Sequence, residues 1–133
     1  MNRIELGKQY FLSGYSCAQS VVLAFKDDIG QDEEVLKKVS SSFGGGLGGL
    51  REVCGAVSGM AIVLGYLKGY SKAGNLEEKK KHYALIQTAV EKFKEKNGSY
   101  ICRELLLNKE KHPCIQLVMD AVEIVCEVLN LDK

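Results

Sequence analysis

Apolar residues recur at helical spacing along almost the whole chain, and the short alternating runs typical of half-buried strands are absent. This pattern predicts an all-α fold. The expected helices cover about residues 4–12, 16–30, 32–43, 51–70, 75–98, 99–107 and 113–129. We therefore expect residues 1–133 to form one compact domain, a bundle of six or seven helices.

Residues that favour helix ends support several of these boundaries. The expected N-caps are Ser16, Asp32, Asn75 and Ser99, and Gly30 and Gly98 are expected to end helices; Pro113 is a residue favoured at the first helical position. The helix expected over residues 51–70 is almost wholly apolar in its middle. It is therefore predicted to be the buried central helix.

Charge and hydropathy exclude several classes of function. The formal net charge is +1, from 18 basic and 17 acidic residues, so nothing indicates binding to nucleic acid or to an anionic membrane. The longest uncharged apolar run, residues 53–67, is shorter than the roughly 20 residues that span a bilayer. The opening "MNRIELGKQYF" lacks the apolar core of a signal peptide. A cytoplasmic protein without membrane insertion is expected.

Cysteine usage is the main chemical signal. The chain has five cysteines, an odd number, which in a reducing compartment indicates metal or redox chemistry rather than a disulfide framework. Four of them fall in the opening turn of an expected helix: Cys17, Cys54, Cys102 and Cys114. Unpaired N–H groups and a partial positive charge at a helix start lower the pKa of a thiol there, and the thiolate is both a nucleophile and a metal ligand.

Cys126 differs from the other four cysteines. It lies inside the last expected helix among apolar residues, where a cysteine usually acts as a small buried hydrophobe. It is about 18 Å along that helix from Cys114, at ~1.5 Å per residue, so the two cannot serve one metal site. The remaining four are the metal-ligand candidates. Four thiolates suit an iron–sulfur cluster or zinc.

The glycines around Cys54 suggest a second element of a site. Gly55 and Gly59 are four residues apart on one helix face, where another backbone or a bulky group could come close, and we treat them as cofactor-binding candidates. The glycines of residues 44–49 could turn N–H groups toward an anion such as a thiolate or a sulfide cluster. The alternative interpretation is a flexible connector followed by tight helix packing.

These residues resemble a known family. Cys17 in "SGYSCAQSVVLAF", then "FGGGLGG", "CGAVSG", Cys102 and Cys114 resemble the redox-active family named for its C_GCAxxG_C_C pattern. The resemblance covers most of the chain and leaves Cys126 outside the pattern. It implies a small helical protein, often encoded beside oxidoreductase or transporter genes, with a redox or metal role at the four cysteines and the glycines Gly55 and Gly59. It specifies no reaction.

The histidines are weaker candidates. His112 lies two residues before Cys114 and is either a ligand, a proton donor to a thiolate or a solvated loop residue. His82 is expected at the surface. The cysteine spacings match no zinc ribbon, zinc finger or ferredoxin pattern, so the fold would have to assemble any metal site.

Three functions remain open. The first is a redox protein whose four cysteines converge on one metal or iron–sulfur site, with an unspecified redox protein as its partner. The second is a metal-free thiol–disulfide protein. The third is a structural or assembly protein, with a homodimer as one form, and the sequence does not decide between enzyme and non-enzyme.

The candidate catalytic residues are Cys54 and Cys114. We expect Cys54 to be the most reactive thiol, because it begins the longest buried helix and follows the glycine run. Burial would act against this choice by raising its pKa. Cys114 is the nearest rival, since Pro113 defines the start of its helix and His112 could share a proton.

Overall fold

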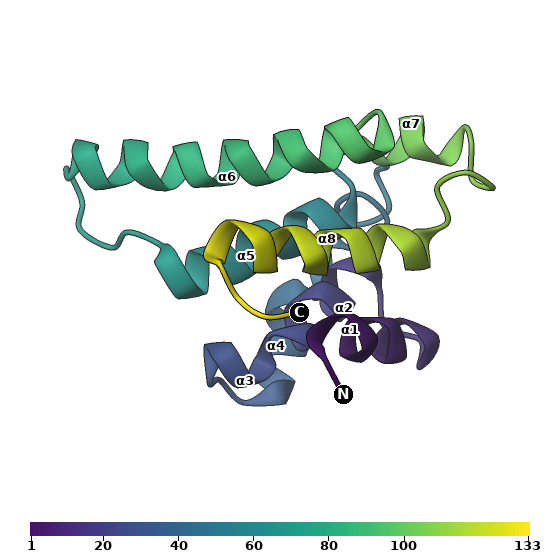
Figure 1. The fold of residues 1–133 in the computed structure, drawn as a ribbon, viewed down its shortest axis with the longest axis horizontal. Helices are drawn as coiled ribbons and strands as arrows, with labels where there is room; N and C mark the ends of the chain where they lie inside the picture. Colours follow the sequence, from purple (N-terminus) through teal and green to yellow (C-terminus); the bar gives the residue numbers. More distant parts are fainter.

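The computed structural model describes residues 1–133 and confirms the all-α fold (Figure 1). No strand forms, and the only β-type pairing is an isolated bridge between Val53 and Ile101. The structure has eight α-helices and one short 3-10 helix: α1 (Arg3–Leu12), α2 (Cys17–Ala24), α3 (Lys26–Ile29), α4 (Glu33–Ser40), η1 (Ser41–Phe43), α5 (Gly55–Lys68), α6 (Leu76–Asn97), α7 (Cys102–Leu106) and α8 (Cys114–Leu129).

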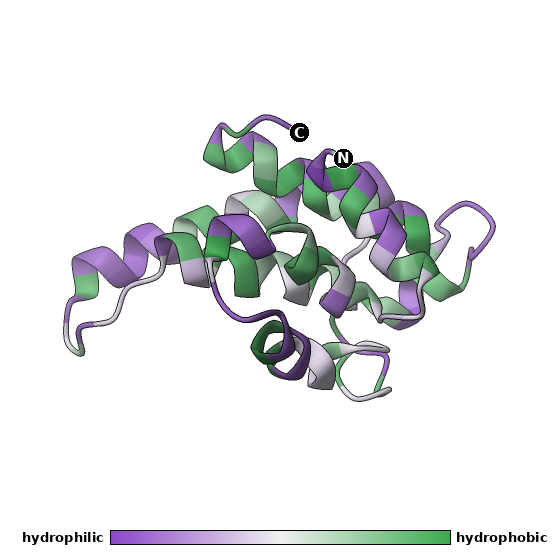
Figure 2. Ribbon diagram, turned by 90° about the horizontal axis from the view of Figure 1, so that it is seen from below, coloured by the Kyte–Doolittle hydropathy of each residue, from purple (hydrophilic) through white to green (hydrophobic).

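The centre of the bundle consists of α2, α5 and α8, which all pack against one another. Helix α1 covers α2 and α8, α4 covers α2, and α6 lies across α5 and α8 (Figure 1). The first half of α6 extends past the bundle and is largely hydrophilic (Figure 2). Burial of the apolar faces of α2, α5 and α8 in one continuous cluster provides the main stabilisation of the fold.

Three predicted N-caps are confirmed. The Ser16 side chain accepts a hydrogen bond from the N–H of Gln19 and completes a capping box. Asp32 and Asn75 also cap their helices through side-chain acceptors, and Gly30 and Gly98 end theirs with left-handed backbone.

The Ser99 cap and the single helix over residues 16–30 are wrong. Helix α7 begins only at Cys102, because the Ser99 hydroxyl accepts from the N–H of Ile101 and donates to the Glu104 carboxylate. The expected second helix breaks at Phe25, which leaves helical geometry (φ −108°, ψ 18°) while its ring is fully buried. This break explains why there are eight helices rather than six or seven.

The central helix begins at Gly55 instead of Arg51. Arg51 has a left-handed backbone (φ 61°), which a right-handed helix cannot include. Residues 51–54 instead pair with residues 100–103 through backbone hydrogen bonds. The Cys54 N–H donates to the Tyr100 carbonyl at 2.8 Å, and the Cys102 N–H donates to the Glu52 carbonyl. This pairing brings the starts of α5 and α7 together.

No helix of the structure combines the length and the apolar character that crossing a membrane requires.

Candidate functional site

Four cysteines lie at four helix starts. Cys17, Cys102 and Cys114 are the first residues of α2, α7 and α8, and Cys54 is the N-cap of α5. Helix α8 begins toward the right-hand side of Figure 1, below α7, and backbone pairing of residues 51–54 with residues 100–103 brings the start of α5 to α7. The structure therefore places four N-terminal ends, with their partial positive charges, in one region.

These four cysteines line a single cavity of about 180 Å³. The polar residues or glycines that share its wall are Ser16, Gly45, Gly46, Arg51, Gly55 and His112. Cys126 is not among them: it is buried in α8, and its charged neighbours are Arg3 and Asp28. The structure thus separates the cysteines into four plus one.

Cys17 and Cys114 are neighbours on the cavity wall, and each thiol shifts the pKa of the other. The Cys17 thiol, together with the charges of Lys109 and Arg51, lowers the pKa of Cys114 to about 6, although partial burial acts in the opposite direction. The ionisable Cys114 beside it, followed by burial, raises the pKa of Cys17 well above its ordinary range. Cys114 therefore ionises first, and Cys17 keeps its proton.

Cys54 is a different kind of thiol. Its side chain is 4% exposed, and burial raises its pKa to about 11 even though the nearby backbone N–H groups of Ala56 and Val57 act in the opposite direction. The structure therefore does not support the expectation that Cys54 is the most reactive cysteine. The loss of hydration at this helix start outweighs the helix charge, and Cys114 is favoured instead.

The glycine run presents only part of its backbone to the cavity. The N–H groups of Gly48 and Gly49 donate to the carbonyls of Ser42 and Gly44. Those of Gly45 and Gly46, which line the cavity, donate no hydrogen bond within the protein. Among residues 45–49, only these two N–H groups are free to donate to an anion, and that they do so stays a prediction.

Gly55 and Gly59 allow α2 to pack closely against α5. A Cβ on Gly59 would lie 2.8 Å from the Cβ of Val21 and 3.0 Å from the carbonyl oxygen of Ala18. A Cβ on Gly55 would lie 3.3 Å from the N–H nitrogen of Ala18. The backbone of α2 therefore approaches the face of α5 that carries these two glycines, as the interpretation of tight helix packing predicted. A cofactor-binding role for the two glycines stays a prediction.

Arg51 is a site residue that the sequence analysis missed. Its Nη1 lies 3.9 Å from the Cys102 sulfur, and it forms no ion pair. The other two arginines, Arg3 and Arg103, are each bound to a carboxylate. Its position in the sequence, between the glycine run and Cys54, could have indicated a site residue. The left-handed backbone of Arg51 could not be predicted, because it accompanies the pairing of residues 51–54 with residues 100–103. Lys109, which also acts on Cys114, was missed because it lies on an exposed turn.

The donor types around the cavity suit a soft metal, but their arrangement does not. Thiolates are the ligands that zinc and iron–sulfur clusters prefer. In the structure, however, no three side chains of His, Cys, Asp or Glu form a group that could hold one ion. A metal or cluster at the four cysteines stays a prediction, and no chemical step is derived from it.

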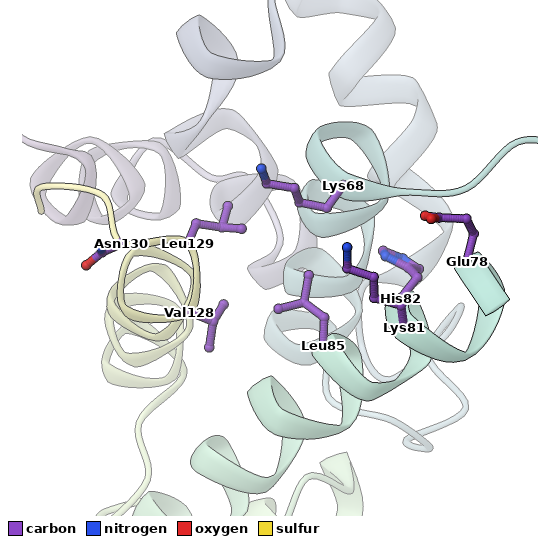
Figure 3. Close-up of a pocket in the computed structure, with 8 residues that line it drawn as sticks. All are labelled: Lys68, Glu78, Lys81, His82, Leu85, Val128, Leu129 and Asn130. Carbon is purple, nitrogen blue, oxygen red and sulfur yellow. The ribbon is translucent and has the colours of Figure 1, made fainter.

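A larger cavity, of about 620 Å³, lies away from the cysteines (Figure 3). It lies between the ends of α5 and α8 and the first half of α6, with Leu85, Val128 and Leu129 as its apolar wall. His82 borders it and is half-buried, with its Nδ1 atom buried and unpaired, so it is not the simple surface residue that was expected. With no thiol in its wall, this cavity does not add to the cysteine site.

Comparison with known proteins agrees with the cysteine pattern. The family model described as "Putative redox-active protein (C_GCAxxG_C_C)" matches residues 15–128. No curated protein and no solved structure matches the chain. The family match covers most of the sequence and includes all four cysteines of the cavity. The chain therefore belongs to the C_GCAxxG_C_C family of redox-active proteins.

Proposed function

We propose that this protein is a metal-free dithiol–disulfide redox protein, in which Cys114 attacks and Cys17 resolves. The observation that carries this proposal is the placement of the two thiols on the wall of one open cavity, where each shifts the pKa of the other. Both residues are partly exposed, so a substrate can reach them, whereas Cys54 is buried. A reactive thiolate beside a protonated resolving thiol is the arrangement that thiol–disulfide exchange requires.

The reaction is a two-electron exchange with a disulfide substrate. The Cys114 thiolate attacks one sulfur of the substrate disulfide, forms a mixed disulfide and releases the first substrate thiolate, which takes up a proton. Cys17 then loses its proton and attacks the Cys114 sulfur of the mixed disulfide. The second substrate thiol leaves, the substrate is reduced, and the two cysteines become a protein disulfide.

The surrounding residues control which thiol reacts first. Arg51, Lys109 and the start of α8 stabilise the Cys114 thiolate electrostatically. Cys17 holds its proton while Cys114 is ionised beside it, so it becomes a nucleophile only after Cys114 is consumed. This order prevents both thiols from competing for one substrate.

The test is disulfide mapping by mass spectrometry after oxidation of the metal-free protein with one equivalent of a neutral disulfide. We expect a Cys17–Cys114 link and a free Cys126. The Cys126→Ala variant is the matched control and should give the same link. A product linking Cys54 to Cys102 without Cys17–Cys114 would overturn the assignment.

A second candidate function is metal or iron–sulfur binding at the same four cysteines. The observation that favours it is the placement of four thiols around one cavity. Metal analysis and visible absorbance of protein purified without oxygen would test it. Stoichiometric metal that is lost in each of the four cysteine-to-serine variants would support this candidate over the dithiol mechanism.

A further inference from the structure

One side of the cysteine cavity carries a positive charge, that of Arg51, which no carboxylate neutralises. The Arg51 guanidinium lies between Cys102 and Gly45, which both line the cavity. The Nη1 atom of Arg51 is 3.9 Å from the Cys102 sulfur and would be 3.6 Å from a Cβ on Gly45. Arg51 is exposed and pairs with no carboxylate. A guanidinium offers several N–H donors in a planar fork. The Cys102 sulfur is a weak acceptor, so most of these donors remain free for another acceptor.

Two backbone donors add to this cationic side. The N–H groups of Gly45 and Gly46 make no hydrogen bond within the protein, although Gly46 is buried. Buried backbone N–H groups in proteins nearly always have an acceptor. A Cβ on Gly46 would lie 2.7 Å from both the Cys102 Cβ and the Arg51 Cα, so only glycine leaves this corner of the cavity open.

No carboxylate balances these donors. The lining of the cavity contains no Asp or Glu, and Lys109 contributes a further positive charge near Cys114. The Cys114 thiolate supplies one negative charge on the opposite part of the wall. The remaining donors at Arg51 and the glycines favour a second, external anion.

The size of the cavity limits what that anion belongs to. At about 180 Å³ it is smaller than the lower end, about 300 Å³, of ordinary small-molecule sites. It can accept the reacting end of a small molecule but not a folded segment of protein. The anionic group and the reacting sulfur must therefore lie close together in the same small molecule.

We propose that Arg51 and the N–H groups of Gly45 and Gly46 form an anion subsite beside Cys114, which binds the carboxylate of a low-molecular-weight thiol or disulfide. This inference rests on the proposed function only in one part, that the bound molecule carries a sulfur which reacts with Cys114. The anion subsite itself rests on the free guanidinium, the free N–H groups and the absence of acids. In the redox step it would hold the substrate carboxylate while the substrate disulfide lies within reach of the Cys114 thiolate.

The subsite can be tested with two alkylating agents of almost the same size, iodoacetate and iodoacetamide. Each reacts when the Cys114 thiolate displaces iodide, and peptide mapping by mass spectrometry gives the rate at this residue. The ratio of the two rates cancels any change in thiolate fraction. This rate ratio is to be measured in the reduced, metal-free full chain, with and without acetate as a competitor.

Three variants separate the subsite from general electrostatics. Arg51→Gln removes the guanidinium, Arg51→Lys keeps the charge without the fork, and Lys80→Gln removes one charge from exposed α6, outside the cavity. We expect the iodoacetate-to-iodoacetamide ratio to fall about tenfold in Arg51→Gln, the size of a lost charge-assisted hydrogen bond. It should fall less in Arg51→Lys and stay unchanged in Lys80→Gln.

A second set of substrates links the subsite to redox chemistry. Wild-type protein should be oxidised faster by the anionic dithiodipropionate than by the neutral hydroxyethyl disulfide, and Arg51→Gln should lose this preference. An unchanged alkylation ratio in Arg51→Gln overturns the subsite. A changed ratio without any Cys17–Cys114 disulfide keeps the subsite and rejects the proposed redox function, so the two failures are distinguishable.

Discussion

The cysteine cavity holds one thiol that ionises near pH 6 and another that ionises near pH 11, Cys114 and Cys54. Both lie at helix starts, so the helix charge does not separate them. The difference comes from burial and neighbours: Cys114 is partly exposed with Cys17 and two cations beside it, and Cys54 is enclosed by the core. The direction of a thiol's pKa shift in this protein is decided by surroundings rather than by position in the helix.

The pH dependence of alkylation should therefore identify Cys114. A lowered pKa means that the reactive thiolate is present above about pH 6 and is lost as the pH falls through that value. With the neutral reagent iodoacetamide, we expect the Cys114 rate to be half-maximal near pH 6. The Cys54 rate should still be rising at pH 10, because its pKa is raised to about 11. If Cys54 reacts faster than Cys114 at pH 7, this assignment is wrong.

Removing the Cys17 thiol tests the pair itself. In Cys17→Ala the Cys114 thiolate loses the neighbour that contributes most to its lowered pKa. We expect the pKa of Cys114 to rise toward the ordinary thiol value of ~8.5, and its alkylation rate at pH 6 to fall severalfold. Cys126→Ala serves as the control, since that thiol is not in the cavity. An unaltered titration curve in Cys17→Ala would show that the two cations alone stabilise the thiolate.

At the scale of elements, the contact between α2 and α5 depends on glycine. Gly59→Ala would place a Cβ 2.8 Å from the Cβ of Val21, so the helices must separate. We expect the free energy of unfolding to fall by about 1–3 kcal/mol, the usual cost of overpacking a core. Denaturant unfolding followed by circular dichroism would measure it.

The same helix offers a matched control. A Cβ on Gly65, also within α5, would have no neighbour within 4 Å. Gly65→Ala should therefore stabilise the protein by about 0.5–1 kcal/mol, because alanine loses less backbone entropy in a helix. Equal destabilisation by both substitutions would contradict the proposed role of Gly59 in close helix packing.

Most of these elements could be predicted from the sequence, since helical periodicity and caps such as Ser16 and Asn75 are local signals. The start of α5 could not, because Arg51 adopts its left-handed backbone only while residues 51–54 pair with residues 100–103. The four cysteines of the site could be identified from their helix-start positions. The choice of Cys17 and Cys114 as the proposed reactive pair could not be made from the sequence, because it depends on how deeply the fold buries Cys54.

At the scale of the whole molecule, α1 holds in position the two helices that carry the proposed reactive pair. A Cβ on Gly7 would lie 3.2 Å from Val122 of α8 and 3.4 Å from Ala24 of α2, so α1 packs closely against both. The chain ends also meet: the Arg3 N–H donates to the Lys133 carbonyl at 2.7 Å, and N and C lie close together in both views of the fold (Figures 1 and 2). The relative position of Cys17 and Cys114 is therefore a property of the whole bundle.

Formation of the proposed Cys17–Cys114 disulfide should stabilise this bundle. The link would join the starts of α2 and α8 and close a loop of roughly 100 residues, which removes chain entropy from the unfolded state worth about 4–5 kcal/mol. Because the two thiols already lie on the wall of one small cavity, little native strain is expected to offset this gain. We expect the oxidised protein to melt on the order of 10 °C above the reduced protein. Thermal unfolding of both forms, with the Cys17→Ala variant treated with the same oxidant as the control, would measure the difference. A lower melting temperature on oxidation would contradict the prediction that a Cys17–Cys114 link fits the native bundle.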